Sequence, residues 1–89
     1  MKPTRRHKQF KKHFKIRIVP NKKLILQFQE CLILFKAGHR GYLLNDHALT
    51  GKLAGKRAFS VAGNIRVVYE ETEDVITFLD IGSHNQVYR

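Results

Sequence analysis

Apolar residues recur at helical spacing in the first half of the chain. One predicted helical face has the spacing i, i+4, i+7, i+8 and i+11, with the residues Leu24, Phe28, Cys31, Leu32 and Phe35. This spacing predicts a helix within residues 20–38. Pro20 suits the first helical position and Gly38 suits the C-terminal cap.

A narrower apolar stripe predicts a second helix upstream, within residues 4–15. Phe10 and Phe14 lie four positions apart, and Lys and Arg residues fill many of the positions around them. This is the pattern of a basic helix with one apolar edge. The next segment, KIRIV at residues 15–19, alternates between polar and apolar residues, and both a strand and the last turn of that helix fit it.

Three short segments of the second half alternate between apolar and polar residues, as strands do: residues 57–61, 65–69 and 75–81. The short connections between them predict an antiparallel meander. Residues 38–56, which precede the strands, are rich in Gly, Asn and Asp and predict a loop.

The register of the first two strands follows from their apolar faces. A two-residue loop would put Arg66 on the apolar side, whereas a three-residue loop, residues 62–64, matches the apolar faces. The second register pairs Arg57 with Tyr69, Phe59 with Val67 and Val61 with Ile65. It leaves Ser60 and Arg66 side by side on the other face.

So small a sheet must bury one face, and we expect both helices to cover the apolar one. The predicted fold class is therefore α+β, a single domain over residues 1–89. Its two N-terminal helices would pack on a small antiparallel sheet.

The charge of the chain is strongly uneven. Lys and Arg number 17 against 7 Asp and Glu, a formal net charge of +10. Basic residues crowd the first 23 positions, the first acidic residue is Glu30, and most of the acidic residues fall between positions 70 and 80. This polarity predicts a polyanion or an acidic protein as the partner.

Cysteine content and hydropathy bear on the compartment. The single Cys31 cannot form an internal disulfide, and its place in an apolar run predicts a buried thiol. The cysteine content therefore gives no indication of an oxidising compartment. No apolar run approaches the ~18 residues of a membrane span, and no secretory signal is evident. We expect a cytoplasmic protein without membrane association.

Two of the five histidines are candidates for an acid–base pair. His47 lies in the predicted loop, and His84 follows Gly82 at the end of the last strand, where a glycine would let the chain turn sharply. Imidazole groups can accept and donate protons near neutral pH. His7, His13 and His39 lie among basic residues and are interpreted as solvated surface residues.

RNA cleavage is the chemistry that such a pair suits. RNA carries its own nucleophile, the 2′-hydroxyl, so cleavage needs a base, an acid and cations for the phosphorane, and no metal or other cofactor is required. The candidate cations are Arg57, Arg66, Lys52 and Lys56, and Tyr88 could stack on a base. No pair of Cys and His residues has the spacing of metal ligands.

Two segments of the chain together resemble the RelE/ParE superfamily of bacterial toxins, and most closely its YafQ-like branch. Their sequences are LLNDHALTGKLAGKRAFSVAGNIRVVY and FLDIGSHNQVY. The resemblance covers residues 43–88. The residues that carry it are His47, Leu49, Gly51, Gly55, Arg57, Tyr69, Gly82, His84 and Tyr88.

The resemblance implies a toxin of a type II toxin–antitoxin system that cleaves mRNA on the ribosome without a metal and is neutralised by a cognate acidic antitoxin. His84 and His47 would share the acid and base roles, in an undecided order, and Arg66 and Arg57 would stabilise the phosphorane. The remaining residues expected to contact mRNA or ribosomal RNA are Ser60, Asn64, Lys52, Lys56, Tyr88, Lys8, Lys11, Lys12 and Lys15.

The chain departs from the YafQ-like pattern at two places. Ser60 stands where these toxins carry a further histidine, and residues 64–65 are Asn-Ile where they carry Asp-Trp. Arg66, in contrast, matches an arginine of RelE. Two alternatives therefore stay open: a ParE-like toxin that binds DNA gyrase without catalysis, and a degenerate toxin that binds RNA without cutting it.

Overall fold

A five-stranded sheet with the strand order β1-β5-β4-β3-β2 forms the centre of the computed structural model, which describes residues 2–88. Its strands are β1 (Thr4–Arg6), β2 (His47–Ala48), β3 (Arg57–Ala62), β4 (Ile65–Glu71) and β5 (Ile76–Ser83). β1 runs parallel to β5, and the other neighbours are antiparallel. The predicted α+β class is confirmed, but the sheet is mixed and not purely antiparallel.

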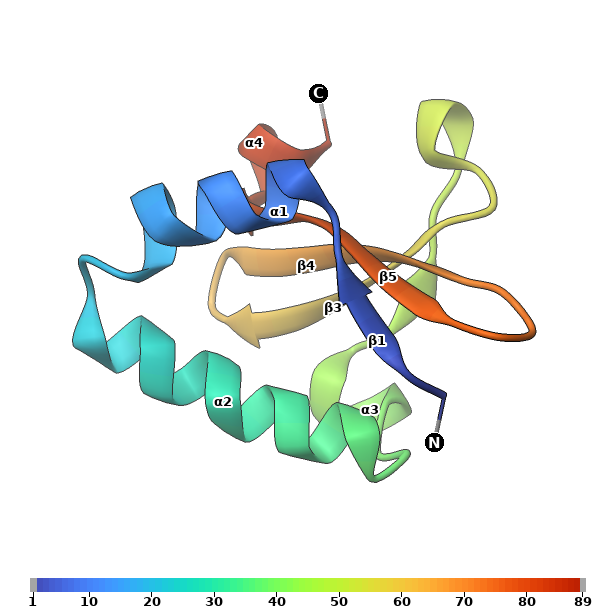
Figure 1. Ribbon diagram of the computed structural model, residues 1–89, viewed down its shortest axis with the longest axis horizontal. Helices are drawn as coiled ribbons and strands as arrows, with labels where there is room; N and C mark the ends of the chain where they lie inside the picture. The colour runs from blue at the N-terminus through green and yellow to red at the C-terminus, as the bar shows by residue number, and fades with distance from the viewer. Residues whose placement is uncertain (1, 89) are drawn as a thin grey trace.

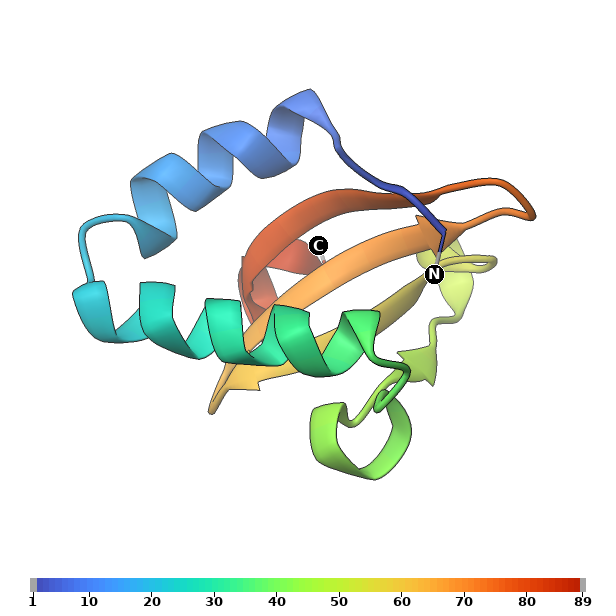
Figure 2. The ribbon, with the colours of Figure 1, turned by 60° about the horizontal axis from the view of Figure 1, so that its bottom comes forward.

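The helical elements lie on both sides of this sheet (Figure 1). They are α1 (Lys8–His13), the π-helical turn η1 (Phe14–Ile18), α2 (Lys22–Lys36), α3 (Gly41–Leu44), the 3-10 turn η2 (Gly51–Leu53) and α4 (His84–Val87). α1 packs over β5 and α2 over β3. Figure 2 shows α1 and α2 on one side of the curved sheet and α4 on the other. Within residues 2–88, no helix is both long and apolar enough to cross a bilayer.

The N-terminal segment differs from the prediction of one continuous helix. Residues Thr4–Arg6 form β1, because the open edge of β5 offers backbone groups that need partners. α1 begins only at Lys8, where the Nδ1 atom of His7 accepts a hydrogen bond from the backbone N–H of Gln9. Residues 15–19 continue the helix as η1, so the helical alternative for this segment is confirmed.

α2 begins two positions later than predicted, at Lys22. Asn21 is its N-cap, and the Asn21 side chain accepts hydrogen bonds from the backbone N–H groups of Lys23 and Leu24. A carboxamide satisfies two of the free N–H groups that open a helix, so Pro20 precedes the cap and does not take the first helical position. Gly38, with φ +87°, follows the last turn as predicted.

Aromatic rings fill the space between the helices and the sheet. The ring of Phe35 stacks on Phe59 at a centroid distance of 4.8 Å and meets Tyr69 edge-on at 5.0 Å. The ring of Phe28 lies 5.0 Å from Phe14. The predicted contact between the apolar face of α2 and the apolar faces of β3 and β4 is confirmed.

The predicted register holds along β3 and β4 except at the turn. Ser60 pairs with Arg66, as expected, but Ala62 pairs with Ile65 across a two-residue turn. The predicted three-residue loop and the Val61–Ile65 pair are therefore wrong. A bulge at Val61 absorbs the extra residue, so the turn is tight and Val61 still faces the core.

The segment predicted as a loop, residues 38–56, holds α3, β2 and η2 and is anchored by a buried carboxylate. The side chain of Asp46, 3% exposed, accepts a hydrogen bond from Nε of Arg57 at 2.7 Å and forms an ion pair with Nη2 of the same residue, also at 2.7 Å. The hydroxyl of Tyr69 also donates to Asp46. A buried charge is stable only when it is paired in this way, so Asp46 holds the segment on the sheet.

Replacing Phe28, which is 2% exposed, by Ala should lower the free energy of unfolding by about 3–5 kcal/mol, because the contacts of its ring are lost and a cavity remains. Leu26→Ala, at a position on the same helix that is 60% exposed, is the matched control and should cost less than about 0.5 kcal/mol. Urea unfolding measures both. Equal losses in the two variants would contradict this core.

Tyr69 should make the stability of the protein depend on alkaline pH. Burial, followed by the hydrogen bond to Asp46, raises the pKa of Tyr69 from 10.0 to about 12. Between these values the unfolded chain binds fewer protons than the native state, so the free energy of unfolding falls as the pH rises.

The comparison with Tyr69→Phe isolates this effect. Between pH 10 and 12 the wild type should lose about 2 kcal/mol of stability relative to the variant, as measured by urea unfolding at each pH. A constant difference between the two proteins would show that Tyr69 is not held in its neutral form.

Candidate active site

A pocket of about 520 Å³ lies between α4 and the segment that follows β2. Its lining residues are His47, Ala48, Leu49, Thr50, Lys52, Leu53, His84 and Tyr88. Two candidate histidines from distant parts of the chain therefore line one cavity. Four of the lining residues, His47, Lys52, His84 and Tyr88, are candidates from the sequence. Leu49 belongs to the residues that carry the family resemblance but was given no role at the site, and Leu53 was not identified.

His47 is presented by β2, which pairs with β3 and is itself an edge strand. The Nδ1 atom of His47 lies 2.8 Å from the backbone carbonyl oxygen of Asn45. Because a carbonyl oxygen only accepts hydrogen bonds, Nδ1 must carry the proton in this contact. In a neutral ring, Nε2 is then the nitrogen that can accept a proton.

His84 is the first residue of α4, which begins directly at the end of β5. Ser83 caps this helix together with Gln86: Ser83 Oγ accepts from Gln86 N, and Gln86 Oε1 accepts from Ser83 N at 2.7 Å. The Oδ1 atom of Asn64 accepts from the backbone N–H of His84 at 3.2 Å. Asn64, predicted to contact RNA, thus fixes the start of α4 to the β3–β4 turn.

Tyr88 lies one helical turn after His84 and supports its ring. The two rings meet edge-on, with centroids 4.5 Å apart. The Tyr88 hydroxyl is buried and has no hydrogen-bond partner in the part of the chain that the structure describes. Burial raises the pKa of Tyr88, and the nearby charge of Arg66 opposes this effect. Tyr88 packs with a small apolar cluster of Ala58, Val68 and Val87.

Arg66 lies on the sheet face that carries α4. Its Nη1 atom donates to Ser60 Oγ at 2.8 Å, so the predicted side-by-side arrangement of these residues is confirmed. Arg66 does not itself line the pocket, but it lies close enough to Tyr88 for its charge to affect the pKa of that residue. This half-buried cation has no carboxylate partner within residues 2–88.

Arg57 and Lys56, predicted as further cations of the site, are not brought to the pocket. Side chains alternate along β3, so Arg57 points to the same face as Phe59 and pairs with Asp46. The ammonium group of Lys56 lies 3.7 Å from Glu70. Neither Arg57 nor Lys56 lines the pocket, whereas Lys52 is exposed and does line it.

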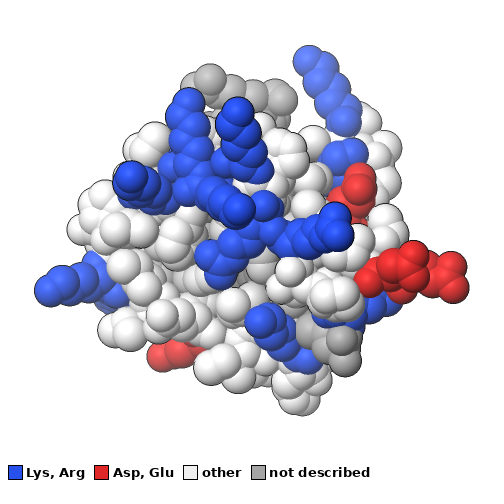
Figure 3. Space-filling model, in the orientation of Figure 1, with Lys and Arg blue, Asp and Glu red and all other residues white. Residues whose placement is uncertain are grey.

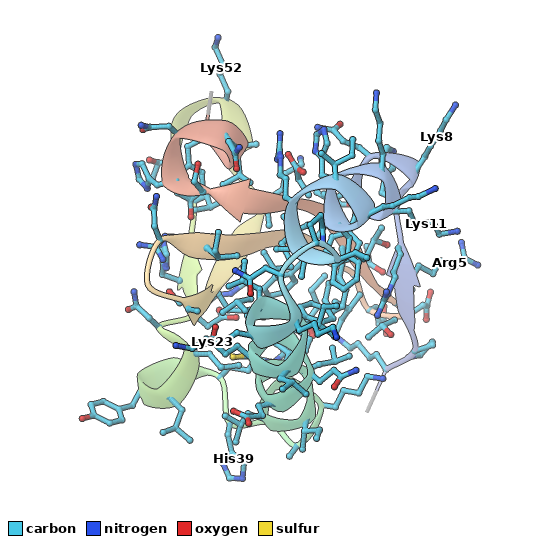
Figure 4. All side chains as sticks on the ribbon, turned by 90° about the vertical axis from the view of Figure 1, so that its left-hand side faces the viewer. Arg5, Lys8, Lys11, Lys23, His39 and Lys52 are labelled. Carbon is cyan, nitrogen blue, oxygen red and sulfur yellow. The ribbon has the colours of Figure 1, made fainter. Side chains whose placement is uncertain are left out.

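The four lysines predicted to contact RNA are all exposed on α1 and η1: Lys8, Lys11, Lys12 and Lys15. Figure 3 shows Lys and Arg side chains gathered over the face that carries α1, and acidic side chains at the right, where the β4–β5 turn lies. In Figure 4, Lys8, Lys11 and Lys52 point away from the body of the protein. The basic surface is therefore free to meet a large polyanion.

His13 is not the solvated residue that the sequence predicted. Its Nδ1 atom lies 2.6 Å from a carboxylate oxygen of Asp80, which is 9% exposed. Gln9 and Arg17 approach the same carboxylate, Nε2 at 3.3 Å and Nη1 at 3.7 Å. The spacing of these three residues, four positions apart, was the signal that could have revealed this face of the helix. His7 and His39 are exposed as predicted.

Gly82 also differs from its predicted role. It lies within β5 opposite Arg66, with no turn of the chain at that point. A Cβ atom on Gly82 would come within 2.6 Å of Arg17 Nη1 and 2.7 Å of Gln86 Oε1. The glycine is needed for this close approach.

Within residues 2–88, no group of three or more His, Cys, Asp or Glu side chains could hold a metal ion.

The fold matches solved structures of bacterial toxins over nearly the whole chain. YafQ from E. coli aligns with a TM-score of 0.83 at 18% sequence identity, covering 100% of both chains. The E. coli DinJ-YafQ complex gives 0.82 at 19% identity, again over 100% of both chains. A metal-bound toxin from Helicobacter pylori gives 0.77 at 24% identity, over 98% of this chain and 99% of the other.

Sequence comparison identifies the family. No curated protein sequence is significantly similar to this chain. The family model described as "Bacterial toxin of type II toxin-antitoxin system, YafQ", however, matches residues 2–89. This match spans every element of the fold and both histidines of the pocket, so the chain belongs to the YafQ family of type II toxin–antitoxin toxins.

Proposed function

We propose that this toxin is an endoribonuclease that cleaves mRNA on the ribosome and so inhibits translation. The observation that carries the proposal is the pocket lined by His47 and His84, on the side of the sheet where Arg66 has no acidic partner within residues 2–88. An acid, a base and a cation are the groups that attack by a 2′-hydroxyl requires.

His47 is the general base in this proposal. The hydrogen bond between its Nδ1 atom and the carbonyl oxygen of Asn45 supports this role, since it leaves Nε2 to take the proton of the 2′-hydroxyl. The 2′-oxygen then attacks phosphorus. The bond from phosphorus to the 5′-oxygen breaks, and protonated His84 donates its proton to that oxygen. The products are a 2′,3′-cyclic phosphate and a 5′-hydroxyl.

The remaining walls of the pocket suit a nucleotide. Leu49 and Leu53 offer an apolar surface for a base, and the side chains of Thr50 and Lys52 offer polar and positive groups at the rim. Arg66 supplies positive charge for the phosphorane, which carries more negative charge than the substrate phosphate. Ser60 holds the Arg66 guanidinium in place through its hydroxyl oxygen.

The partners in this proposal are the ribosome with its mRNA, and an acidic antitoxin. The exposed lysines of α1 and η1 would meet ribosomal RNA phosphates, and the net charge of +10 would attract both polyanions and an acidic protein. The similarity to YafQ in the DinJ-YafQ complex supports an antitoxin partner. We assign the protein to the cytoplasm, where translating ribosomes are found.

His84→Gln should leave the fold and ribosome binding intact and lower the cleavage rate by ~10²–10⁴-fold, the usual contribution of one general acid or base. Arg66→Ala should lower the rate comparably, because the charge that stabilises the phosphorane is lost. Mapping the 5′ ends of mRNA on translating ribosomes measures cleavage. The matched control is His39→Gln, the same chemical change at an exposed histidine that does not line the pocket.

The toxicity of a double variant separates this proposal from its alternatives. A His84→Gln, Arg66→Ala protein that is fully toxic would point to a ParE-like toxin that binds DNA gyrase. A wild-type protein that binds ribosomes but leaves the message intact would point to an RNA-binding toxin without catalysis. In the proposed function, the double variant is non-toxic and the wild type cuts.

Ribosome affinity should fall steeply as the salt concentration rises, because lysines that bind phosphates displace condensed counterions. Changing Lys8, Lys11, Lys12 and Lys15 to Gln should lower the slope of log affinity against log salt by roughly 3, somewhat under one per lost contact. The control changes Lys22, Lys23 and Lys36 of α2 to Gln. Equal slope changes per lysine in both sets would show that α1 is no preferred RNA contact.

A further inference from the structure

The guanidinium group of Arg17 lies directly over the backbone of Gly82. Arg17 Nη1 donates to the backbone carbonyl of Ile81 at 2.9 Å and lies 2.6 Å from the point that a Cβ atom on Gly82 would occupy. Gly82 does not adopt a positive φ, so its backbone conformation does not require glycine. The absence of a side chain at Gly82 is what admits Arg17.

Arg17 thereby reaches the same sheet face as Arg66. Gly82 pairs with Arg66 across β5 and β4, and Arg66 pairs with Ser60 across β4 and β3. Residues directly opposite each other in antiparallel strands point to the same face, about 4.5–5.5 Å apart. Ser60, Arg66 and the Arg17 guanidinium therefore form one row across the sheet, and His84 follows Gly82 by two residues.

Asp80 and the π-helical turn direct Arg17 to this position. Arg17 Nη1 lies 3.7 Å from an Asp80 oxygen, and the Arg17 side chain is 22% exposed. The nearby apolar residues Ile16 and Val19 are 59% and 46% exposed. The turn η1 therefore directs Arg17 toward the sheet and leaves these two apolar side chains in contact with solvent. π-helical turns are frequent at functional sites.

The row carries more positive charge than its surroundings neutralise. Asp80 is shared with His13 and with the backbone N–H of Ile81, and Arg66 forms no ion pair within residues 2–88. Each guanidinium has five N–H donors, and the described part of the chain accepts one hydrogen bond from each arginine. The remaining donors of both guanidinium groups can serve an anion, and phosphate matches their planar geometry.

We propose that Arg17 and Arg66 together bind the scissile phosphodiester of the RNA substrate and stabilise its phosphorane. The inference rests on the proposed nuclease function and adds to it a second cation, supplied by the helical layer instead of the sheet. Arg17 contacts the phosphate from the side of β5 and Arg66 from β4. Gly82 is the position that lets the two guanidinium groups approach each other.

Gly82→Ala offers a test that displaces Arg17 without removing it. The new Cβ atom would meet the ends of the Arg17 and Gln86 side chains, which can move, at 2.6 and 2.7 Å, and Gln86 Cβ at 3.2 Å, so the fold should tolerate it with a small shift of α4. Single-turnover cleavage of mRNA on translating ribosomes gives the rate at saturating protein and the half-saturating concentration separately. Arg17→Ala and Gly82→Ala should each lower the saturating rate by ~10²-fold, with thermal unfolding confirming that both variants fold.

The combination of the two changes identifies the cause. In Arg17→Ala, adding Gly82→Ala should have no further effect, because the displaced group is already absent. If Gly82→Ala acted through Gln86 and the cap of α4, its effect would persist in the double variant. Arg17→Lys should recover part of the rate. Lys36→Ala, the loss of one exposed positive charge at the end of α2, should cleave at the wild-type rate.

Two results would overturn the two-arginine site and leave the nuclease function standing. One is wild-type cleavage by Arg17→Ala while His84→Gln is inactive. The other is multiplicative loss when Arg17→Ala and Gly82→Ala are combined. Wild-type protein that binds ribosomes but leaves the message uncut in the same assay would overturn the proposed function, and the two-arginine site with it.

Discussion

The packing of Phe35 against three strands is the contact on which the rest of the structure depends. Its ring lies 4.8 Å from Phe59, 5.0 Å from Tyr69 and 5.8 Å from Phe78, on β3, β4 and β5 respectively. Since side chains alternate along a strand, burying these rings under α2 commits the intervening residues to the opposite face. Ser60 and Arg66 are among those residues, so the core determines which face is left for chemistry.

Two buried carboxylates then attach the elements that surround this second face. Asp46 accepts from Arg57 and Tyr69 and holds the segment with His47 beside β3. Asp80 accepts from His13 and holds α1 along β5. Each carboxylate is stable in its buried position only because cationic or hydroxyl donors surround it. The loop on one side of the sheet and the helix on the other are therefore positioned by charge as well as by apolar contact.

α1 has two faces with different physical roles. Its outer face carries exposed lysines, and four of the acidic residues lie at or beside the β4–β5 turn, away from that face (Figure 3): Glu70, Glu71, Glu73 and Asp74. Its inner face contributes Phe10 to the core and Gln9 and His13 to the carboxylate of Asp80. In the proposed function, the lysines of α1 would attract the RNA. The turn η1, which continues α1, would supply Arg17 to bind the phosphate of that RNA.

The sequence by itself determined the elements whose signals are local. Apolar spacing predicted α2, and alternation predicted β3, β4, β5 and the Ser60–Arg66 pair, because these patterns depend only on the helical and strand periods. Only the tertiary structure decided β1, the pairing of His13 with Asp80 and the pairing of Arg57 with Asp46. Each of these rests on a partner far along the chain: the open edge of β5, Asp80 and Asp46. A residue's own sequence neighbourhood carries no record of such partners, so a basic residue that binds a buried carboxylate looks the same in sequence as one exposed to solvent.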